Sequence, residues 1–387
     1  MKPTGGVCFL FDDFHPVFSG HAIYMRQIMR RLAARGRALT VICWNPGGLP
    51  ATEDHEGIRI VRVAPPRSDL ERGRRVLGAL WSVRDRFDCL HVNGFPDPYL
   101  MWVAFCRLLG KRLVLQSTLM GSDDGEAYRR NHRGGALRVR QLACVDAITA
   151  ISRPLIASFT DIGFPADKLV YLPQGVDLAR FTPATAAEKR ALRSERGLDP
   201  DGPLVLFVGT ILERKGVDLL VEAWAAVQAR LPGAQLALVG MHEFDGSHEN
   251  RDALNAFAGA MRERVAAGGL RVVFAGLHND IVPWYRAADL FVLPSRKEGF
   301  GNVILEAMAC RVPVVVTPMD GVALETVDPG VNGLIVRDVP ELAAGIASLL
   351  EDPERAARFG EAGAARVRRL FDLEAIADRY DELYFPR

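Results

Sequence analysis

Two glutamates flank a glycine turn in the second half of the chain, in the order Glu298-Gly299-Phe300-Gly301-Asn302 and then Glu306. The apolar run before them predicts a strand, and the apolar spacing after Asn302 predicts a helix. The two glycines allow a sharp turn and a close approach of the backbone to a ligand. A carboxylate before a helix also serves as a cap, and one inside a helix is often only solvated. Beside a helix N-terminus, the two acids would suit an anionic ligand that carries hydroxyl groups.

Two further strand–turn–helix patterns lie upstream. The apolar run 204–208 is followed by a turn from Gly209 to Gly216, which contains the basic pair Arg214 and Lys215. Near the start of the chain, Gly20 stands at the entry of a predicted helix, an arrangement compatible with phosphate binding. Turns of this kind also need glycine for geometry alone, so Gly20 by itself does not establish a ligand.

Predicted strands and helices alternate along the chain, and the strands are apolar throughout. This pattern is typical of an α/β protein whose parallel sheets are covered by helices on both faces. Ligands of such sheets bind at the carboxyl ends of the strands. The loops at Gly20, Asn93 and Met120–Asp124 all follow predicted strands. We therefore expect them at one edge of the first sheet.

The length of 387 residues allows two domains with separate cores. The alternation breaks at Pro173–Asp177, and a polar, charged segment follows up to Gly202. We place a first domain at 1–180, a linker at 181–202 and a second domain from 203. Asp199-Pro200-Asp201 matches the D-x-D pattern that some transferases use for a metal, but its position before Gly202-Pro203 favours a turn.

The composition, with 49% hydrophobic and 25% charged residues, is that of a soluble globular protein. The net charge of +1 is unevenly spread: residues 1–180 carry a net +8 and residues 181–387 a net −7. This charge asymmetry has two explanations. It reflects chance variation of surface residues, or it shows that the basic first domain faces an anionic partner such as a membrane surface or a phosphorylated acceptor. The basic stretches 67–86 and 129–140 are the candidates for that face. We expect no nucleic-acid partner.

Six cysteines without a C-x-x-C pair indicate free thiols in a reducing compartment. The apolar run at Val7–Phe11 is too short for a signal peptide and is followed by two aspartates. The longest apolar stretch, Tyr99–Leu109, is too short to span a membrane and contains Arg107. We therefore expect a cytoplasmic protein, with peripheral attachment to the inner face of the membrane as a further hypothesis.

Together these motifs resemble those of the family-4 retaining glycosyltransferases, and the matches run nearly end to end. Glu298 and Glu306 look like the family's E-x7-E pair, and Gly209–Gly216 looks like its phosphate-binding turn. Tyr171–Asp177 with Phe181 resembles its interdomain signature. The resemblance implies the GT-B fold, in which two Rossmann-like, doubly wound domains face each other across a cleft. It also implies a second domain at 203–370 and a C-terminal helix, 371–387, that crosses back to the first domain.

The resemblance assigns the donor site residue by residue. Arg214 and Lys215 would contact the donor diphosphate, with Gly209 in the same turn. Glu298 would hold hydroxyls of the transferred sugar, and Glu306 the ribose. The remaining donor-binding candidates act mainly through the backbone and are Gly20, Leu277, His278, Asn279, Gly299, Phe300, Gly301 and Asn302. We take Arg214, Lys215 and Glu298 as the catalytic set, and Asn93, Met120 and Asp123 as candidates on the acceptor side.

Two positions depart from the family pattern. Thr210 stands where many members have Arg after the first glycine of the phosphate turn, and the Arg214-Lys215 pair would compensate. Met120 stands where many members have the His of a T-x-H-G motif. A group near the sugar in those enzymes is therefore absent here. Either catalysis does not need that group or the activity is lower, and we favour the first.

The implied reaction moves a sugar from a nucleotide diphosphate sugar to an acceptor hydroxyl with retention at the anomeric carbon. We expect a UDP-sugar first and a GDP-sugar second. The acceptor would be a glycan, a lipid-linked compound or a small molecule in polysaccharide, glycolipid or glycoconjugate synthesis. No cofactor or metal is expected, because the cationic side chains would neutralise the leaving diphosphate. The alternatives are a nucleotide-sugar epimerase or hydrolase of the same fold, and an inactive nucleotide-sugar-binding subunit.

Overall fold

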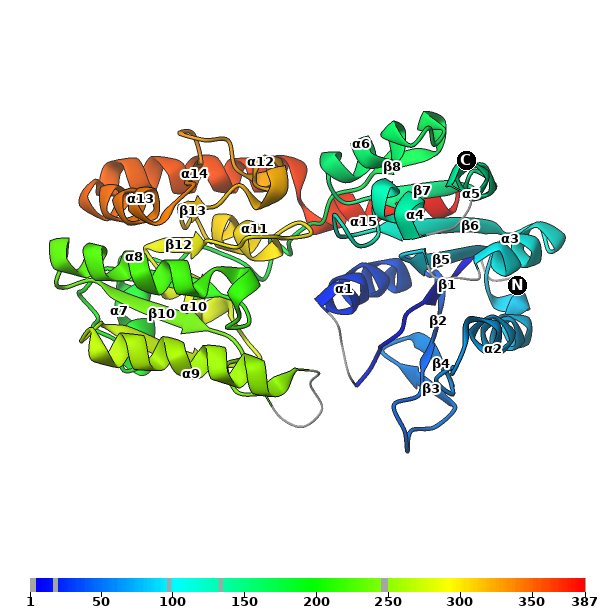
Figure 1. The fold of residues 1–387 in the computed structure, drawn as a ribbon, viewed down its shortest axis with the longest axis horizontal. Coiled ribbons are helices and arrows are strands. Elements are labelled where there is room, and N and C mark those ends of the chain that lie inside the picture. Colours follow the sequence, from blue (N-terminus) through cyan, green and yellow to red (C-terminus); the bar gives the residue numbers. More distant parts are fainter. Residues whose placement is uncertain (1–4, 17–19, 96–98, 132–134, 245–249, 387) are drawn as a thin grey trace. The chain divides into compact units, whose positions relative to one another are not determined.

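The computed structural model describes residues 5–16, 20–95, 99–131, 135–244 and 250–386. The chain divides into two compact units: unit 1 contains residues 1–174 and 373–387, and unit 2 contains residues 175–372. In each unit, helices cover both faces of a largely parallel sheet (Figure 1). The predicted class, α/β with two doubly wound Rossmann-like domains, is confirmed.

The sheet of unit 1 has the order β3-β4-β2-β1-β5-β6-β7-β8. Neighbouring strands are parallel except for β3, which pairs antiparallel with β4. The strands are β1 (Gly6–Leu10), β2 (Ala38–Trp44), β3 (Thr52–His55), β4 (Ile58–Val63), β5 (Cys89–Asn93), β6 (Arg112–Ser117), β7 (Ala147–Ala150) and β8 (Leu169–Tyr171). The winding direction changes between β1 and β5, and in such sheets this point is where a crevice forms.

Two hydrophobic clusters sandwich this sheet. Helices α1 and α15 contribute to one cluster, and α2 to α6 contribute to the other. The helices of unit 1 are α1 (Gly20–Ala34), α2 (Asp69–Ser82), η1 (Arg84–Arg86), α3 (Tyr99–Leu108), α4 (Gly125–Asn131), α5 (Gly135–Leu142), α6 (Arg153–Asp161), η2 (Ala166–Lys168) and α15 (Leu373–Tyr384). The second basic stretch therefore contains two helices, and Arg133 in it lies outside the described residues.

Helix α15 is tied to the unit 1 sheet by a buried chain of hydrogen bonds. The Tyr380 hydroxyl accepts from Gln116 Nε2 at 2.8 Å, and the Tyr384 hydroxyl lies 3.0 Å from Nδ1 of His91. His91 Nε2 lies 2.9 Å from Gln116 Oε1, which closes the chain. Burial lowers the pKa of His91 to about 3, so its ring stays neutral. The network gives hydrogen-bond partners to these four buried side chains and fixes where the C-terminal helix docks.

The sheet of unit 2 is entirely parallel and has the order β11-β10-β9-β12-β13-β14. Its strands are β9 (Leu204–Val208), β10 (Gln235–Val239), β11 (Val272–Gly276), β12 (Leu290–Leu293), β13 (Val314–Val316) and β14 (Gly333–Ile335). The three central strands β9, β12 and β13 are buried along their whole length, which explains their unbroken apolar sequence. The winding direction changes between β9 and β12.

The helices of unit 2 include one in the segment predicted as a linker. They are α7 (Ala186–Glu195), η3 (Glu213–Lys215), α8 (Val217–Arg230), α9 (Arg251–Ala267), α10 (Val282–Ala287), α11 (Asn302–Ala309), η4 (Met319–Gly321), α12 (Ala323–Thr326), α13 (Val339–Glu351) and α14 (Pro353–Leu370). Among them, α7 occupies the middle of the predicted linker.

The segment 181–202 is part of unit 2 rather than a linker. A capping box begins α7, in which the Thr185 hydroxyl accepts from Glu188 N and the Glu188 carboxylate accepts from Thr185 N. Arg193 is buried and donates to Asp289 at 2.6 Å and to the Gly202 carbonyl at 3.0 Å. The polar residues of 181–202, which suggested a linker, lie largely on the exposed face of α7. The change of unit lies at 174/175 instead of 180.

All six cysteines are free thiols, and only Cys144 is exposed. Among the described residues, no helix combines the length and the apolar character that crossing a bilayer requires.

Candidate active site

The candidate site in unit 2 forms at the carboxyl ends of β9 and β12, the neighbouring strands between which the winding direction changes. The turn that holds η3 follows β9, and the segment 294–301 follows β12. These are the two stretches that the sequence singled out. The parallel fold therefore brings residues about 80 positions apart to one point of the sheet edge.

Gly216 allows the two loops to touch. Its φ of 68° is left-handed, and a Cβ there would lie only 1.9 Å from the Pro294 carbonyl oxygen. The backbone N–H of Arg296 donates to the Arg214 carbonyl at 2.8 Å. A side chain at position 216 would push the loops apart, and so glycine is required there.

An ion pair that the sequence analysis missed fixes the same contact. The Arg296 guanidinium donates to both carboxylate oxygens of Asp218, at 2.8 and 2.6 Å, and also to the Glu213 carbonyl. Burial raises the pKa of Asp218, but the hydrogen bonds from Arg296 outweigh this and hold it below its ordinary value. Neither residue has a local sequence signal that would have identified the pair.

The basic pair and the first glutamate meet at this contact. Lys215 Nζ lies 2.6 Å from Glu298 Oε1, and both side chains are largely buried. Arg214 Nη1 lies 3.7 Å from Glu298 Oε2 and donates to the Lys297 carbonyl at 2.7 Å. Because 47% of the Arg214 side chain is exposed, it is the more solvated of the two cations.

Glu306 is held differently from Glu298. It projects from α11, is partly buried, and accepts a hydrogen bond of 2.7 Å from the Tyr285 hydroxyl on α10. Burial raises the pKa of the Glu306 carboxyl, and the hydrogen bond from Tyr285 only partly offsets this. Tyr285 is a second residue that the sequence analysis missed.

The glycine turn joins these groups. Gly301 has a φ of 82° and caps α11 without a side-chain hydrogen bond. Asn302 Oδ1 and Ser295 Oγ are buried and have no hydrogen-bond partner in the described part of the chain. The side chain of Phe300 is buried and packs on Phe371 with ring centroids 5.8 Å apart. Only its backbone is available to a ligand.

The remaining donor-side candidates of unit 2 lie at the same sheet edge. Gly209 ends β9, and a Cβ at Gly240 would lie 2.0 Å from the Gly209 carbonyl oxygen, so the backbones after β9 and β10 are in close contact. Leu277 to Asn279 follow β11. Leu277 is 69% exposed, and His278 Nε2 lies 3.0 Å from the Ala275 carbonyl oxygen.

Gly20 belongs to unit 1, where it is the exposed first residue of α1. The preceding residues 17–19 lie outside the described ranges. That Gly20 approaches a donor bound to unit 2 stays a prediction.

Unit 1 has a cavity of about 530 Å³ where β1, β2, β5 and β6 end. Asn93 lines it, and Asn93 Oδ1 is buried without a hydrogen-bond partner among the described residues. Asp123 also lines it, but its carboxylate accepts from Thr118 N at 2.9 Å and Leu119 N at 2.6 Å. Asp123 therefore organises the loop that carries Met120. Met120 itself is half-buried and is not among the lining residues.

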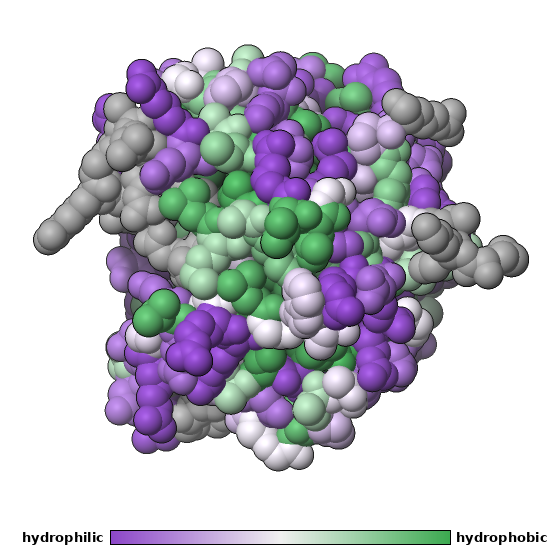
Figure 2. Space-filling view, turned by 90° about the vertical axis from the view of Figure 1, so that its right-hand side faces the viewer, coloured by the Kyte–Doolittle hydropathy of each residue, from purple (hydrophilic) through white to green (hydrophobic). Residues whose placement is uncertain are grey.

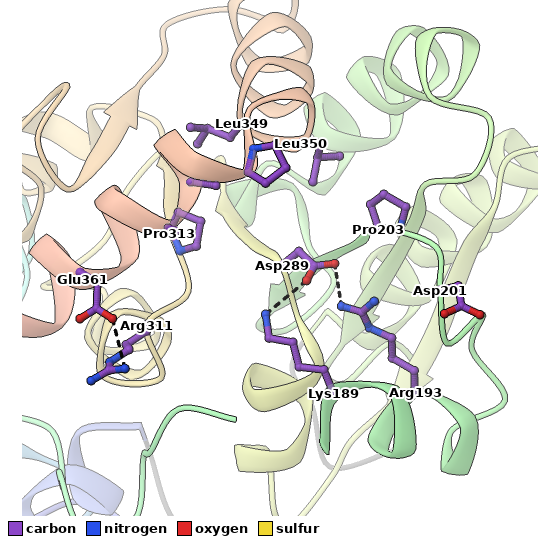
Figure 3. A pocket seen from close by; sticks show the side chains of 13 residues that line it. Lys189, Arg193, Asp201, Pro203, Asp289, Arg311, Pro313, Leu349, Leu350 and Glu361 are labelled. Atoms are coloured by element: carbon purple, nitrogen blue, oxygen red, sulfur yellow. Dashed lines mark hydrogen bonds and ion pairs between the residues drawn. The ribbon is translucent and has the colours of Figure 1, made fainter. Parts of the chain in front are cut away.

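A second cavity, of about 470 Å³, lies at the opposite edge of the unit 2 sheet (Figure 3). Its charged residues are paired with one another: Lys189 and Arg193 with Asp289, and Arg311 with Glu361. Asp201 reaches this cavity, while Asp199 accepts from the backbone N–H groups of Asp201 and Gly202. Asp199–Asp201 is thus the turn that its sequence context favoured.

The described residues hold one cluster with potential metal ligands, formed by His15, Glu53 and His55 in unit 1. The two imidazole rings stack with centroids 3.8 Å apart and planes at 18°. In-plane lone pairs of nearly parallel rings cannot converge on one ion. Glu53 is also engaged by Arg62 at 2.6 Å. The cluster is better explained as packing between the β3 hairpin and the loop after β1.

Models of two glycosyltransferase families match the two halves of the chain. Residues 18–180 match Glycosyltransferase Family 4, and residues 202–352 match Glycosyl transferases group 1. Among solved structures, a sucrose-phosphate synthase from Thermosynechococcus elongatus is 25% identical, with a TM-score of 0.75 over 98% of both chains.

Several of the curated relatives are mannosyltransferases by name, and two of them show the range of the match. The lipopolysaccharide core biosynthesis mannosyltransferase LpsB of Rhizobium meliloti is 32% identical over 84% of this chain and 93% of its own. The GDP-mannose-dependent monoacylated alpha-(1-6)-phosphatidylinositol monomannoside mannosyltransferase of Corynebacterium glutamicum is 34% identical, but the match spans only 61% of either chain. With both halves matched and a relative aligned over most of its length, the chain belongs to the family-4 glycosyltransferases.

Proposed function

We propose that this protein is a retaining glycosyltransferase that transfers a hexose from a nucleoside diphosphate sugar to a hydroxyl of a glycan or glycolipid. One observation carries the proposal: Lys215 and Glu298 lie 2.6 Å apart where β9 and β12 end. This arrangement places a cation for a phosphate beside a carboxylate for sugar hydroxyls, at the edge where open α/β sheets bind ligands.

Each residue has one role in the proposed reaction. Lys215 and Arg214 stabilise the charge that grows on the diphosphate as its oxygen separates from the anomeric carbon. The ammonium of Lys215 has three donors, so it can serve Glu298 and a phosphate together. Glu298 accepts from sugar hydroxyls, and Glu306, held by Tyr285, accepts from the ribose.

The proton of the acceptor needs a destination. We assign it to the departing phosphate oxygen, on the same face of the sugar as the incoming hydroxyl. The bond from the anomeric carbon to the acceptor oxygen then forms where the bond to the diphosphate breaks, and the configuration is retained. This step uses no side chain as base, which is consistent with Met120 in place of histidine. It also uses no metal ion.

The acceptor is assigned to the cavity of unit 1. Asn93 Oδ1 and the indole of Trp44 are suited to a sugar, because hydroxyls bond to amides and sugar rings pack on aromatic faces. Arg72 lies 3.8 Å from Asp12 and over the Trp44 ring, so this cation is already paired within the cavity. We therefore propose an uncharged sugar or polyol as the group that enters.

The names of these two mannosyltransferase relatives support a mannosyl donor. We therefore treat GDP-mannose and a UDP-sugar as equally good candidates for the donor. The deciding experiment is a thermal-shift series with GDP-mannose, UDP-glucose and ADP-glucose. We expect one nucleotide to raise the melting temperature in a saturable way, because a ligand that binds only the folded state stabilises it.

Turnover with the selected donor then tests the reaction itself. The product should keep the anomeric configuration of the donor by NMR, and a chelator should not change the rate. If the donor is consumed or epimerised equally fast without an acceptor, the protein is a hydrolase or epimerase. If no nucleotide shifts the melting temperature, the proposal fails.

A further inference from the structure

Two neighbouring helices of unit 1 expose apolar side chains on their outer faces. Helix α2 presents Leu70 and Trp81, which are 68% and 53% exposed, and the partly buried Leu77 lies at helical spacing between them. Helix α3, which packs beside α2, ends with Leu108, the most exposed of these side chains at 81%. We call this surface the α2–α3 face.

The α2–α3 face is a patch and not a scatter of single residues. Figure 2 shows an apolar area on this side of the molecule at about the height that α3 occupies in Figure 1, with hydrophilic residues along much of its border. Ala104 of α3 is also exposed, whereas Met101 is partly buried against the core. Exposed apolar patches with polar rims mark interaction surfaces.

The rim of the patch is basic. Residues 67–112 contain nine Lys and Arg against five Asp and Glu, a net charge of +4. Arg74 and Arg86 are exposed and have no acidic partner within the described ranges. The Arg84 guanidinium lies 4.7 Å from the centre of the Trp81 ring. Trp81 therefore presents an apolar surface directly beside the positive charge of Arg84.

We propose that the α2–α3 face is a docking surface for an anionic lipid bilayer. Leu108 and Trp81 would enter the boundary between headgroups and acyl chains, while Arg74, Arg84 and Arg86 remain at the level of the lipid phosphates. A second protein would also cover apolar side chains. Arg84 pairs with Asp85 at 3.6 Å, but the segment remains net positive, which favours a surface of dense negative charge. The contact is peripheral. The proposal does not depend on the glycosyltransferase activity, because it can be measured without any sugar.

Vesicle sedimentation tests the proposal with the full chain. Vesicles of phosphatidylcholine with phosphatidylglycerol should carry the protein down at low salt, whereas vesicles of phosphatidylcholine alone should not. Binding should weaken as salt is added, because salt screens the attraction of the basic rim. The double variant Trp81→Ser/Leu108→Ser should bind about tenfold more weakly, since it removes the apolar part of the contact.

Three controls make the result decisive. The matched double variant Val331→Ser/Leu370→Ser removes two exposed apolar side chains of unit 2 and should bind like the wild type. Arg74→Glu/Arg86→Glu should lose binding at low salt. Trp81→Phe should still bind but lose the blue shift of tryptophan fluorescence on adding the anionic vesicles.

Two outcomes would overturn the proposal. One is that anionic vesicles do not sediment the wild type, or sediment the wild type and Trp81→Ser/Leu108→Ser equally. The other is that the wild type is a dimer by light scattering and only this double variant is a monomer. In that case a second copy of the chain covers the face.

Discussion

At the scale of single residues, the two cations of the candidate site are not equivalent. Lys215 is nearly buried against Glu298, whereas almost half of the Arg214 side chain is exposed and its guanidinium is held by the Lys297 carbonyl. Water screens a charge in proportion to its exposure. Lys215 should therefore contribute more to stabilising a leaving diphosphate than Arg214 does.

We predict that Lys215→Ala lowers kcat by about 10²–10³, the usual loss for one preorganised donor. Arg214→Ala should lower it by about tenfold, because its charge is more screened. Initial rates with saturating donor give both values. Lys215→Arg is the control that keeps the positive charge but replaces the ammonium with a planar guanidinium.

Loss of Lys215 also removes the closest cation from Glu298 and leaves only Arg214 at 3.7 Å, so each variant needs a melting temperature beside its rate. The melting temperature of Lys215→Ala/Glu298→Gln, which also removes the Glu298 charge, shows how much of any stability loss comes from that charge. Equal rates for Lys215→Ala and the wild type would contradict the site.

The sequence allowed the main site residues to be predicted, but not what holds them. Glu298, Glu306, Arg214 and Lys215 stand in motifs with fixed spacing, and the parallel topology determines where such motifs meet. Arg296 and Tyr285 could not be predicted, because their contacts join separate segments and depend on the packed loops. The Phe300 side chain packs on Phe371, which also lies in a separate segment of the chain.

At the scale of elements, the β3–β4 hairpin is clamped to α1 by one carboxylate. Glu56 accepts from Arg26 at 2.8 and 2.6 Å and from Arg30 at 2.9 Å. Hydrogen bonds from Arg30 and then Arg26 lower the pKa of Glu56 from 4.5 to about 2. A carboxyl group whose pKa is lower in the folded state contributes stability above pH 4.5. That contribution is lost as the pH falls through 2.

We predict that Glu56→Gln lowers the free energy of unfolding by about 1 kcal/mol at neutral pH, a value reduced for the solvent exposure of the site. The difference from the wild type should shrink as the pH falls from 4.5 towards 2. Urea unfolding at a series of pH values measures it.

Asp54→Asn in the same hairpin is the matched control. Asp54 pairs with Arg59 at 2.6 Å but is 68% exposed, so its replacement should change little at any pH. A pH-independent loss in Glu56→Gln would show that Glu56 acts through packing and not through its charge.

Element boundaries were harder to predict than element types. The strands and most helices follow from apolar periodicity, which reports burial directly. The segment 181–202 was misassigned because α7 buries only part of its surface and is anchored by Arg193, a polar residue that composition counts towards a linker. A buried arginine has no signature in a single sequence.

At the scale of the whole molecule, unit 1 is discontinuous in sequence. Residues 1–174 form its sheet and most of its helices, and α15 returns from the far end of the chain to cover one face. Leu373, Ile376, Ala377, Tyr380 and Tyr384 of α15 are all buried in that cluster. Burial of four large side chains is worth roughly 1.5–3 kcal/mol each, which is comparable with the total stability of a domain.

We predict that a chain ending at Asp372 keeps a folded unit 2 but loses unit 1. Calorimetry should show two transitions in the full chain and one in the shortened chain, and nucleotide should still raise the melting temperature of the latter. Two unchanged transitions after truncation would mean that α15 is dispensable.

The position of α15 in the sequence also affects the order in which the two units can fold during translation. A protein emerging from the ribosome exposes its N-terminal residues first, and domains generally fold in that order. Here unit 2 has all its residues available before unit 1 does, because α15, which covers one face of the unit 1 sheet, is translated after unit 2. Until then, the β-strand surface beneath α15 stays uncovered. We expect nascent unit 1 to be the part of the molecule that depends on chaperones, although it begins the chain.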